Sequence, residues 1–390
     1  MSGARPPPLS LYVHLPWCVA KCPYCDFNSH KAGDSPPRGR YIKALKADLV
    51  AEASRANGRS IQTIFMGGGT PSLFSGAEIE EILDAAHAVF DVASDVEITL
   101  EANPGTVECG ALASYRSAGV NRLSLGAQSF DPDSLQRLGR IHGPAEILDA
   151  FQEAVAARFD SINIDLMYGL PGQTHAMALA DLRKAVDLHP EHISYYHLTL
   201  EPNTIFYSRP PRDLPNDDAA FEMQESCHAL LSAAGYSRYE ISAFARPGFE
   251  CRHNLNYWLF GDYIAVGAGA HGKMTDPQGA IHRYQKPAHP LAYIEALTDG
   301  SRRTALRRLD REDIAFEYML NVLRLPQGFT TTAFEERTGL ESGVLRARLE
   351  ACRGKGLLQQ IDAESWQPTG LGLRFLNDLQ EQFLPSQAVL

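Results

Sequence analysis

Long hydrophobic runs are absent from this chain of 390 residues. No window holds about 18 uninterrupted apolar residues, the length that a bilayer-spanning helix needs. The first ten residues contain prolines and no apolar stretch, so we expect no signal peptide there. Internal repeats and low-complexity tracts are also missing. These absences exclude transmembrane, repeat and disordered classes and leave a globular protein.

An excess of basic residues is missing as well. Lys and Arg number 36 against 47 Asp and Glu, which gives a net charge of -11. Nonspecific nucleic-acid binding needs a basic surface, so we expect no nucleic-acid partner. Apolar residues make up 44% of the chain, enough for a sizeable core. The length predicts one large domain and one smaller domain.

Cysteine is scarce, yet three of the seven cysteines fall in one short run. Cys18, Cys22 and Cys25 have the spacing C-x3-C-x2-C and directly follow an apolar, strand-like stretch. Three thiolates can hold three irons of a [4Fe-4S] cube and leave the fourth iron open to bind and reduce a small molecule. The alternatives are thiols buried as small hydrophobic groups and a zinc site, for which no fourth Cys or His lies at ligand spacing nearby. The other cysteines are scattered at Cys109, Cys227, Cys251 and Cys352.

Free thiols and a cluster motif point to a reducing compartment, and we expect the protein in the cytoplasm.

Short strand-like runs alternate with amphipathic helical runs as far as about residue 245. Several strand-like runs are too apolar for a half-exposed antiparallel sheet and are typical of parallel strands buried on both faces. The alternation predicts an α/β fold with a parallel sheet, and its repetition predicts a TIM-type barrel, closed or partly open. The expected strands are Leu9–Leu15, Thr63–Met66, Glu97–Ala102, Arg122–Ala127, Ser161–Met167, His192–Leu200 and Tyr239–Ala243. The expected helices are Arg40–Arg55, Ala77–Phe90, Gly110–Ala118, Pro144–Ala157, His175–His189 and Asp217–Ala234.

Polar residues recur where these strands end, which is where barrel enzymes place their sites. Gly67–Gly69 follow one strand, Glu101 and Gln128 lie at the ends of the next two, and Asp165 lies in another. Each has a structural alternative, because three glycines also suit a tight turn and an aspartate also caps helices.

The C-terminal part predicts helices over 291–297, 311–323, 331–337 and 341–355, a hairpin over 357–368, and a last helix over 370–383. Helices followed by a hairpin indicate a winged-helix-like module. Arg346, Arg348, Arg353 and Lys355 could read DNA there, but the simpler interpretation is a solvated helix face. We predict a core barrel over 1–245, a connecting segment over 246–286 and the C-terminal domain over 287–390.

The cysteine spacing, with Tyr24 before the last cysteine, resembles the radical S-adenosylmethionine (SAM) superfamily. Tyr12-Val-His-Leu-Pro-Trp-Cys18 and Cys22-Pro-Tyr-Cys25-Asp-Phe-Asn are similar to the branch that contains oxygen-independent coproporphyrinogen III dehydrogenase and a related heme chaperone. The resemblance implies a partly open (β/α)6 barrel, a [4Fe-4S] cluster on the three cysteines, and SAM bound through its amine and carboxylate at the open iron. The SAM residues that it implies are Tyr12, Tyr24, Gly68, Gly69, Thr70, Glu101, Gln128, Arg140 and Asp165. Taken alone, Arg140 could equally be a surface cation.

A second motif, His253-Asn254-Leu-Asn-Tyr257-Trp258, resembles the HNxxYW sequence of the heme chaperone. The resemblance implies heme contact, with an imidazole for the iron and flat aromatic faces for the porphyrin. A lone histidine before an asparagine turn is also common as a structural residue. His271 fits such a structural role in a glycine-rich turn.

Two departures from the dehydrogenase bear on function. The dehydrogenase has a fourth cysteine where this chain has Phe27, and it has a longer N-terminal arm, whereas eleven residues precede Tyr12 here. With the HNxxYW motif, these departures favour a chaperone that binds heme and passes it to an acceptor protein such as a respiratory cytochrome. The alternative is oxidative decarboxylation of coproporphyrinogen III to protoporphyrinogen IX.

Overall fold

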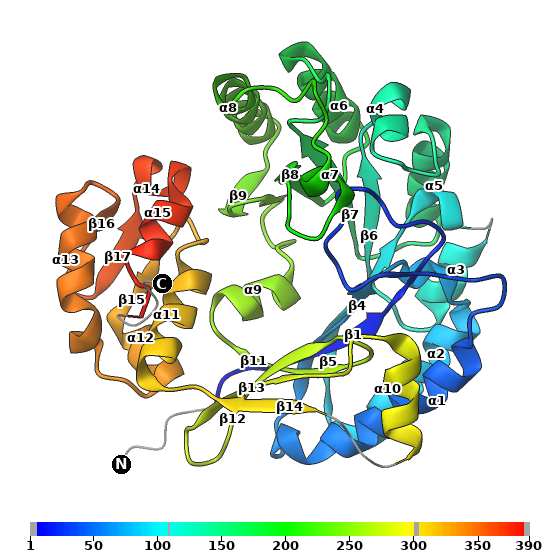
Figure 1. Ribbon diagram of the computed structural model, residues 1–390, viewed down its shortest axis with the longest axis horizontal. Helices are drawn as coiled ribbons and strands as arrows, with labels where there is room; N and C mark the ends of the chain where they lie inside the picture. Colours follow the sequence, from blue (N-terminus) through cyan, green and yellow to red (C-terminus); the bar gives the residue numbers. More distant parts are fainter. Residues whose placement is uncertain (1–5, 108–109, 300–303, 386–390) are drawn as a thin grey trace.

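A 12-stranded curved sheet dominates the fold (Figure 1). The structure, a computed structural model, describes residues 6–107, 110–299 and 304–385, so Cys109 lies outside the described residues. Six neighbouring strands run parallel, and the two ends of the sheet do not pair with each other, which gives the expected partly open (β/α)6 barrel. These strands are β1 (Leu9–Leu15), β4 (Ile61–Gly68), β5 (Val92–Ala102), β6 (Arg122–Gln128), β7 (Ser161–Tyr168) and β8 (His192–His197). The helices that follow them are α1 (Arg38–Glu52), α2 (Gly76–Val89), α3 (Ala111–Ser117), α5 (Pro144–Ala156), α6 (His175–Asp187) and α8 (Asp217–Ala233).

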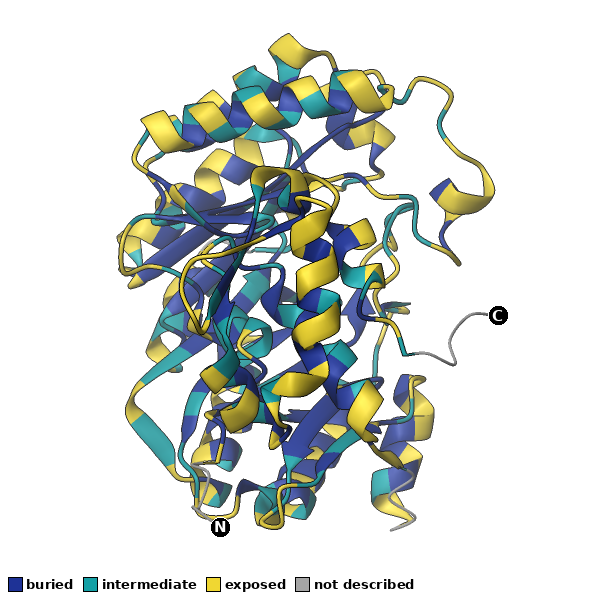
Figure 2. Cartoon of the chain, turned by 90° about the vertical axis from the view of Figure 1, so that its left-hand side faces the viewer, coloured by how far each residue is buried: buried dark blue, intermediate teal, exposed yellow. Residues whose placement is uncertain are grey.

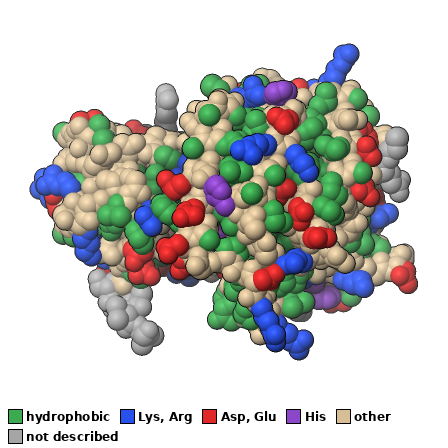
Figure 3. Space-filling view, turned by 90° about the horizontal axis from the view of Figure 1, so that it is seen from above, with side chains coloured by type: hydrophobic (Ala, Val, Ile, Leu, Met, Phe, Trp, Pro, Cys, Tyr) green, Lys and Arg blue, Asp and Glu red, His purple; other side chains and the backbone are tan. Residues whose placement is uncertain are grey.

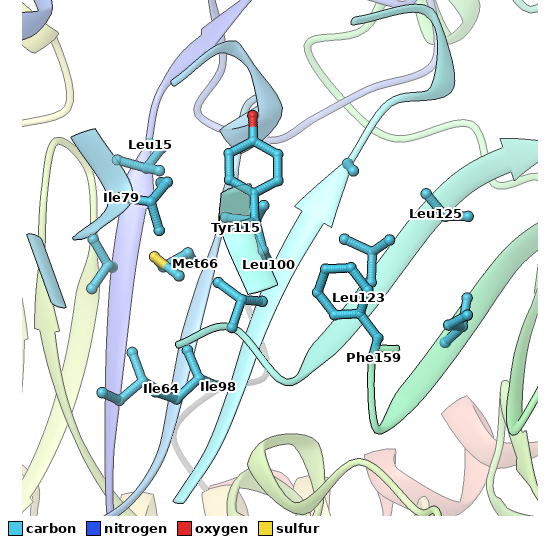
Figure 4. Close-up of a cluster of buried hydrophobic side chains, with 14 of the residues drawn as sticks. Leu15, Ile64, Met66, Ile79, Ile98, Leu100, Tyr115, Leu123, Leu125 and Phe159 are labelled. Carbon is cyan, nitrogen blue, oxygen red and sulfur yellow. The ribbon is translucent and has the colours of Figure 1, made fainter. Parts of the chain in front are cut away.

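The main hydrophobic core lies between the sheet and the surrounding helices. Leu123 and Leu125 of β6 pack in one cluster with Ile79 of α2 and Tyr115 of α3 (Figure 4). Successive strand residues point to opposite faces, so the polar residues that alternate with these leucines face the barrel interior. The barrel therefore has an apolar exterior under its helices and a polar interior.

Four strands beyond the expected ones extend the sheet past β1. Strand β11 (Asp262–Val266) pairs with β1 in parallel, and β12 (His271–Thr275), β13 (Ile281–Gln285) and β14 (Ala305–Arg308) follow in antiparallel order. The pattern of apolar and polar residues in the sequence did not predict these strands. The division of the chain at 245 and 286 stays a prediction, although the sheet itself continues to Arg308.

The prediction of a single strand over Tyr239–Ala243 is wrong. The chain instead forms two antiparallel strands, β9 (Ser237–Glu240) and β10 (Ala243–Ala245). The Glu240 carboxylate stabilises the turn between them, because Oε1 accepts hydrogen bonds from the Ser242 backbone N–H at 2.8 Å and from its hydroxyl at 2.7 Å.

The C-terminal part has its own hydrophobic cluster, which includes Tyr318, Phe334 and Trp366. A small sheet and the helices of this part surround it in the expected winged-helix-like arrangement. The predicted last helix is broken at Phe375, whose φ of -109° and ψ of 52° are not helical. The elements are α10 (Pro290–Thr298), which packs beside α1, then α11 (Arg311–Val322), β15 (Phe329–Thr330), α12 (Thr331–Thr338), α13 (Arg346–Gly354), β16 (Leu358–Gln360), β17 (Ser365–Pro368), α14 (Gly370–Arg374) and α15 (Leu376–Glu381).

Helices on the outside are exposed on one face and buried on the other (Figure 2). Acidic and basic side chains intermix on the face seen in Figure 3. Arg348, one of the cations considered for DNA contact, donates to the backbone carbonyls of Phe383 and Leu384. No helix within the described ranges has the length and hydropathy needed to cross a membrane.

Candidate functional site

The barrel interior holds a cavity of about 660 Å³. This volume lies within the range of small-molecule and cofactor sites, which is roughly 300–1,000 Å³. Every residue that the sequence analysis assigned to the cluster, to SAM or to heme lines it. These residues are Cys18, Cys22, Cys25, Tyr12, Tyr24, Gly68, Gly69, Thr70, Glu101, Gln128, Arg140, Asp165, His253, Asn254, Tyr257 and Trp258. His271 is exposed at the start of β12 and is not among the lining residues.

The cysteine loop follows β1 and is closed by a short parallel ladder. Strands β2 (Trp17–Cys18) and β3 (His30–Lys31) form this ladder. Asn28 then anchors the loop to the rest of the protein, because its side-chain NH2 donates to the carbonyls of Ala268 and Ala288, each at 2.9 Å. The loop is therefore held before any cofactor binds.

The three thiols suit a cluster better than a single ion. No three His, Cys, Asp or Glu side chains in the described ranges converge as the ligands of one metal ion do. A [4Fe-4S] cube takes one thiolate per iron, so it needs sulfurs spread around a loop. Burial raises the pKa of the Cys18 and Cys25 thiols, so bound iron would displace their protons.

The glycine segment after β4 lies against the start of the cysteine loop. Gly69 N–H donates to Leu15 O at 2.8 Å, and Thr70 N–H donates to Trp17 O at 2.7 Å. A Cβ at Gly69 would lie 2.6 Å from Trp17 O, so no side chain fits there. Gly68 has φ of 111°, and its N–H donates to Glu101 Oε2 at 3.1 Å. The glycines therefore make a tight turn and also bring backbone to the cavity wall.

Two carboxylates line the wall beyond the glycines. Burial, with a smaller contribution from Asp165, raises the pKa of Glu101 from 4.5 to about 7. Burial also raises the pKa of Asp165, which accepts hydrogen bonds from Ser124 at 3.0 Å and from Asn163 at 2.8 Å. A cationic ligand group beside these carboxylates would favour their ionised form and lower their pKa again.

Arg140 lines the same cavity. Its Nη1 donates to Cys22 Sγ at 3.6 Å and its Nη2 to Gly126 O at 2.8 Å. Its Nε is buried and has no hydrogen-bond partner among the described residues. An unpartnered buried N–H is costly, and an anionic ligand group in the cavity would satisfy it.

The HNxxYW motif forms a helix, α9 (Arg252–Trp258), so no asparagine turn follows His253. The cause is Glu97 of β5, whose carboxylate accepts the backbone N–H groups of Arg252 at 3.2 Å and His253 at 3.0 Å. These are N–H groups that a helix leaves free at its start. One strand of the barrel therefore fixes where the motif begins.

His253 is buried and both of its ring nitrogens are engaged. Thr63 donates its hydroxyl to Ser10, so its oxygen accepts from His253 Nδ1 at 2.7 Å. Nε2 then accepts from the Tyr257 hydroxyl at 2.9 Å. Burial lowers the pKa of His253 to about 3, so the imidazole is neutral at neutral pH. Its only lone pair on nitrogen is directed to Tyr257.

Polar residues of strands β5 to β8 also line the cavity and were not assigned from the sequence. They are Thr99, Arg122, Ser124, Asn163, His192, Ser194 and Tyr196. A signal for them exists in the sequence. Polar residues alternate with apolar ones along β6, and this period of two marks the face toward the interior.

Comparisons with known proteins agree with this geometry. The model of the radical SAM superfamily matches residues 12–185, and that of the HemN C-terminal domain matches residues 309–375. A solved structure of coproporphyrinogen III oxidase (HemN) from Escherichia coli, described as a radical SAM enzyme, has a TM-score of 0.83. That likeness covers 98% of this chain and 91% of the other at 24% identity, so it shows the fold alone.

Curated relatives match over almost their whole length. Heme chaperone HemW of Escherichia coli (strain K12) is 49% identical, with 97% of this chain and 98% of that protein covered. Heme chaperone HemW of Haemophilus influenzae is 47% identical, with 98% and 99% covered. The chain therefore belongs to the radical SAM superfamily and, within it, to the HemW family.

Proposed function

We propose that this protein is a heme chaperone, which binds heme in its barrel cavity and passes it to an acceptor protein. The observation that carries the proposal is that one cavity brings the cysteine loop, the SAM residues and α9 together. Relatives named heme chaperone HemW, matched from end to end, support the same function. The dehydrogenase alternative has only the shared fold in its favour.

The cysteine loop would hold a [4Fe-4S] cluster through Cys18, Cys22 and Cys25. A cluster with an open iron supplies an electron and a coordination position when it is bound. The chain's own residues would then bind and orient SAM. Arg140 has a free buried N–H for a carboxylate, and Glu101 offers a carboxylate for an ammonium group.

The remaining SAM assignments follow from position. Asp165 and Gln128 would take the ribose hydroxyls, and Tyr12 and Tyr24 would line the cluster and the adenine. Gln128 ends β6 with φ of 70°, a conformation that non-glycine residues adopt at a cost and that is common at functional sites.

Helix α9 would supply the heme contacts. The neutral His253 ring offers Nε2 to iron once the Tyr257 hydroxyl moves away from it. Tyr257 and Trp258 present flat rings to a porphyrin, and the Asn254 side chain makes no hydrogen bond within the described part of the chain. A site whose iron ligand already has an internal partner can release heme and close again, as a donor must.

The partners in this proposal are heme and a heme-acceptor protein. Free thiols at all six described cysteines fit a reducing compartment, and we place the protein in the cytoplasm.

The deciding experiment measures heme uptake and decarboxylation side by side. Anaerobically reconstituted protein should bind about one heme per chain and show a Soret band of histidine ligation. His253→Ala should reduce or shift this band and leave iron–sulfur absorbance in place. His282→Ala is the matched control, since His282 contacts Asp276 outside the cavity. Robust decarboxylation of coproporphyrinogen III without heme uptake would overturn the proposal.

A further inference from the structure

A second arginine faces the cavity, at the end away from the cysteine loop. Arg122 is the first residue of β6, and its side chain is only 4% exposed. Among the described residues that line the cavity, Arg122 and Arg140 are the only Lys or Arg. Neither the cluster nor the SAM assignment uses Arg122.

The two arginines lie at different levels along the barrel. Arg140 is held at Gly126 O, four residues along β6 from Arg122. Four residues of a strand span about 13 Å. Arg122 therefore marks a separate end of the cavity, beside the start of α9.

Arg122 is anchored by one nitrogen and free at the other two. Its Nη1 donates to Ser161 Oγ at 2.8 Å and to Phe249 O at 3.1 Å. Its Nε and Nη2 make no hydrogen bond to any described residue, although the side chain lines the cavity. These two groups lie on one edge of the guanidinium plane, which is the edge that binds a carboxylate through two parallel hydrogen bonds.

One acid lies beside Arg122, on the side of its anchored nitrogen. Glu97 pairs with Nη1 at 4.0 Å, and its oxygens also accept the N–H groups at the start of α9, so it leaves Nε and Nη2 without a partner among the described residues. His192 nearby is buried, and burial holds its pKa well below the usual value, so it adds no charge. The end of the cavity next to α9 therefore holds a guanidinium with two unused donors.

We propose that Arg122 binds a carboxylate side chain of the porphyrin that rests against α9. The inference depends on the proposed heme-binding function and adds to it the group that orients the ligand. SAM would bring its carboxylate to Arg140 at the other end, so the two arginines would sort the two ligands. Heme carries propionate side chains at one edge of the ring, and Arg122 would fix that edge.

The test compares iron protoporphyrin IX with its dimethyl ester, which cannot carry the negative charge. Charge-assisted hydrogen bonds predict that esterification weakens binding to the wild-type holoprotein by roughly 10- to 150-fold. In Arg122→Gln this difference between the two ligands should vanish. Arg353→Gln is the matched control, because it removes the same charge from an exposed pair with Glu350, and it should keep the full ester effect.

Several outcomes would overturn the proposal. An equal ester effect in wild type and Arg122→Gln would place carboxylate recognition elsewhere, and no ester effect in the wild type would remove it altogether. Failure of the wild type to take up heme would instead refute the proposed function, and the inference with it. Arg122→Lys keeps a point charge but loses the fork, so it should show an intermediate ester effect. This variant decides the matter if Arg122→Gln does not fold, and an unchanged effect in it contradicts the proposal.

Discussion

The guanidinium of Arg324 lies 4.1 Å from the centre of the Trp258 ring. Arg324 follows α11 in the C-terminal part, and Trp258 ends the HNxxYW helix α9. This contact therefore joins the C-terminal part to α9. Arg324 Nη2 also pairs with the buried Glu240 carboxylate at 3.0 Å. The indole N–H of Trp258 is buried and has no partner among the described residues. The C-terminal domain thus covers one face of a side chain assigned to heme.

We expect Arg324→Ala to loosen this contact. The cation–π contact and the ion pair together predict a loss of about 1–3 kcal/mol in the free energy of unfolding, measured with denaturant. The heme spectrum should shift as well, because Trp258 loses its cover. Arg374→Ala is the control. The guanidinium of Arg374 lies 3.7 Å from the centre of the Phe221 ring and joins α14 to α8, away from the HNxxYW motif. An equal spectral shift in both variants would contradict a specific link through Trp258.

The cluster prediction concerns iron content. Anaerobic reconstitution should give about four irons per chain, and alanine at Cys18, Cys22 or Cys25 should abolish this. Cys352→Ala is the control. The Cys352 thiol is buried among the hydrophobic side chains of the C-terminal part, so its removal should affect stability only. A requirement for Cys227, Cys251 or Cys352 would defeat the idea of three protein ligands and one open iron.

The SAM prediction concerns Arg140. Arg140→Ala should weaken SAM binding by roughly 10- to 150-fold, because a charge-assisted hydrogen bond is lost, and equilibrium binding measures this. Iron content should persist. Arg137→Ala provides the comparison, since this exposed arginine pairs with Asp213 on the surface. Unchanged SAM affinity in Arg140→Ala would remove Arg140 from the site.

The pH prediction concerns Glu101, whose pKa is raised from 4.5 to about 7. The native state holds the Glu101 proton more tightly than the unfolded state. Glu101 therefore contributes to the free energy of unfolding below pH 4.5, and this contribution is lost as the pH rises through 7. The loss is at most about 3 kcal/mol. Unfolding of wild type and Glu101→Gln between pH 5 and pH 8 measures this. Wild type should lose stability relative to the variant, and parallel pH curves would refute the shift.

Glu81→Gln, which removes a surface carboxyl, is the control for Glu101→Gln. Glu81 forms an exposed ion pair with Lys46, so this substitution should leave the pH dependence of wild type unchanged.

The last prediction concerns access to His253. The Tyr257 hydroxyl occupies Nε2 and must leave before iron can bind there. Tyr257→Phe removes this competitor, so heme affinity should rise by about 2- to 10-fold, measured by Soret titration. Tyr263→Phe is the matched control, because its ring packs 4.3 Å from that of Tyr257 but its hydroxyl contacts Arg283. Weaker heme binding in Tyr257→Phe would show that the hydroxyl supports the bound heme.

Much of the barrel could be predicted from the sequence because its signals are local. Apolar strands and amphipathic helices alternate along the chain, and the cysteine triplet lies within eight residues. Glu101 and Gln128 could be assigned to one site because the carboxyl ends of parallel strands meet at the same edge of a barrel. The alternation along β6 also contained Arg122, which was visible in the sequence but was not interpreted.

Tertiary structure alone decided the rest. Helix α9 is seven residues long, too short for a clear periodic pattern, and it forms where Glu97, distant in sequence, accepts its first N–H groups. Asn28 meets Ala268 only because β11 pairs with β1 across the length of the chain. Residue types and their spacing determined which chemistry this protein can hold, because thiols, carboxylates and imidazoles are properties of single side chains. Their arrangement around one cavity depends on strand register and packing between distant segments, and local sequence does not encode these.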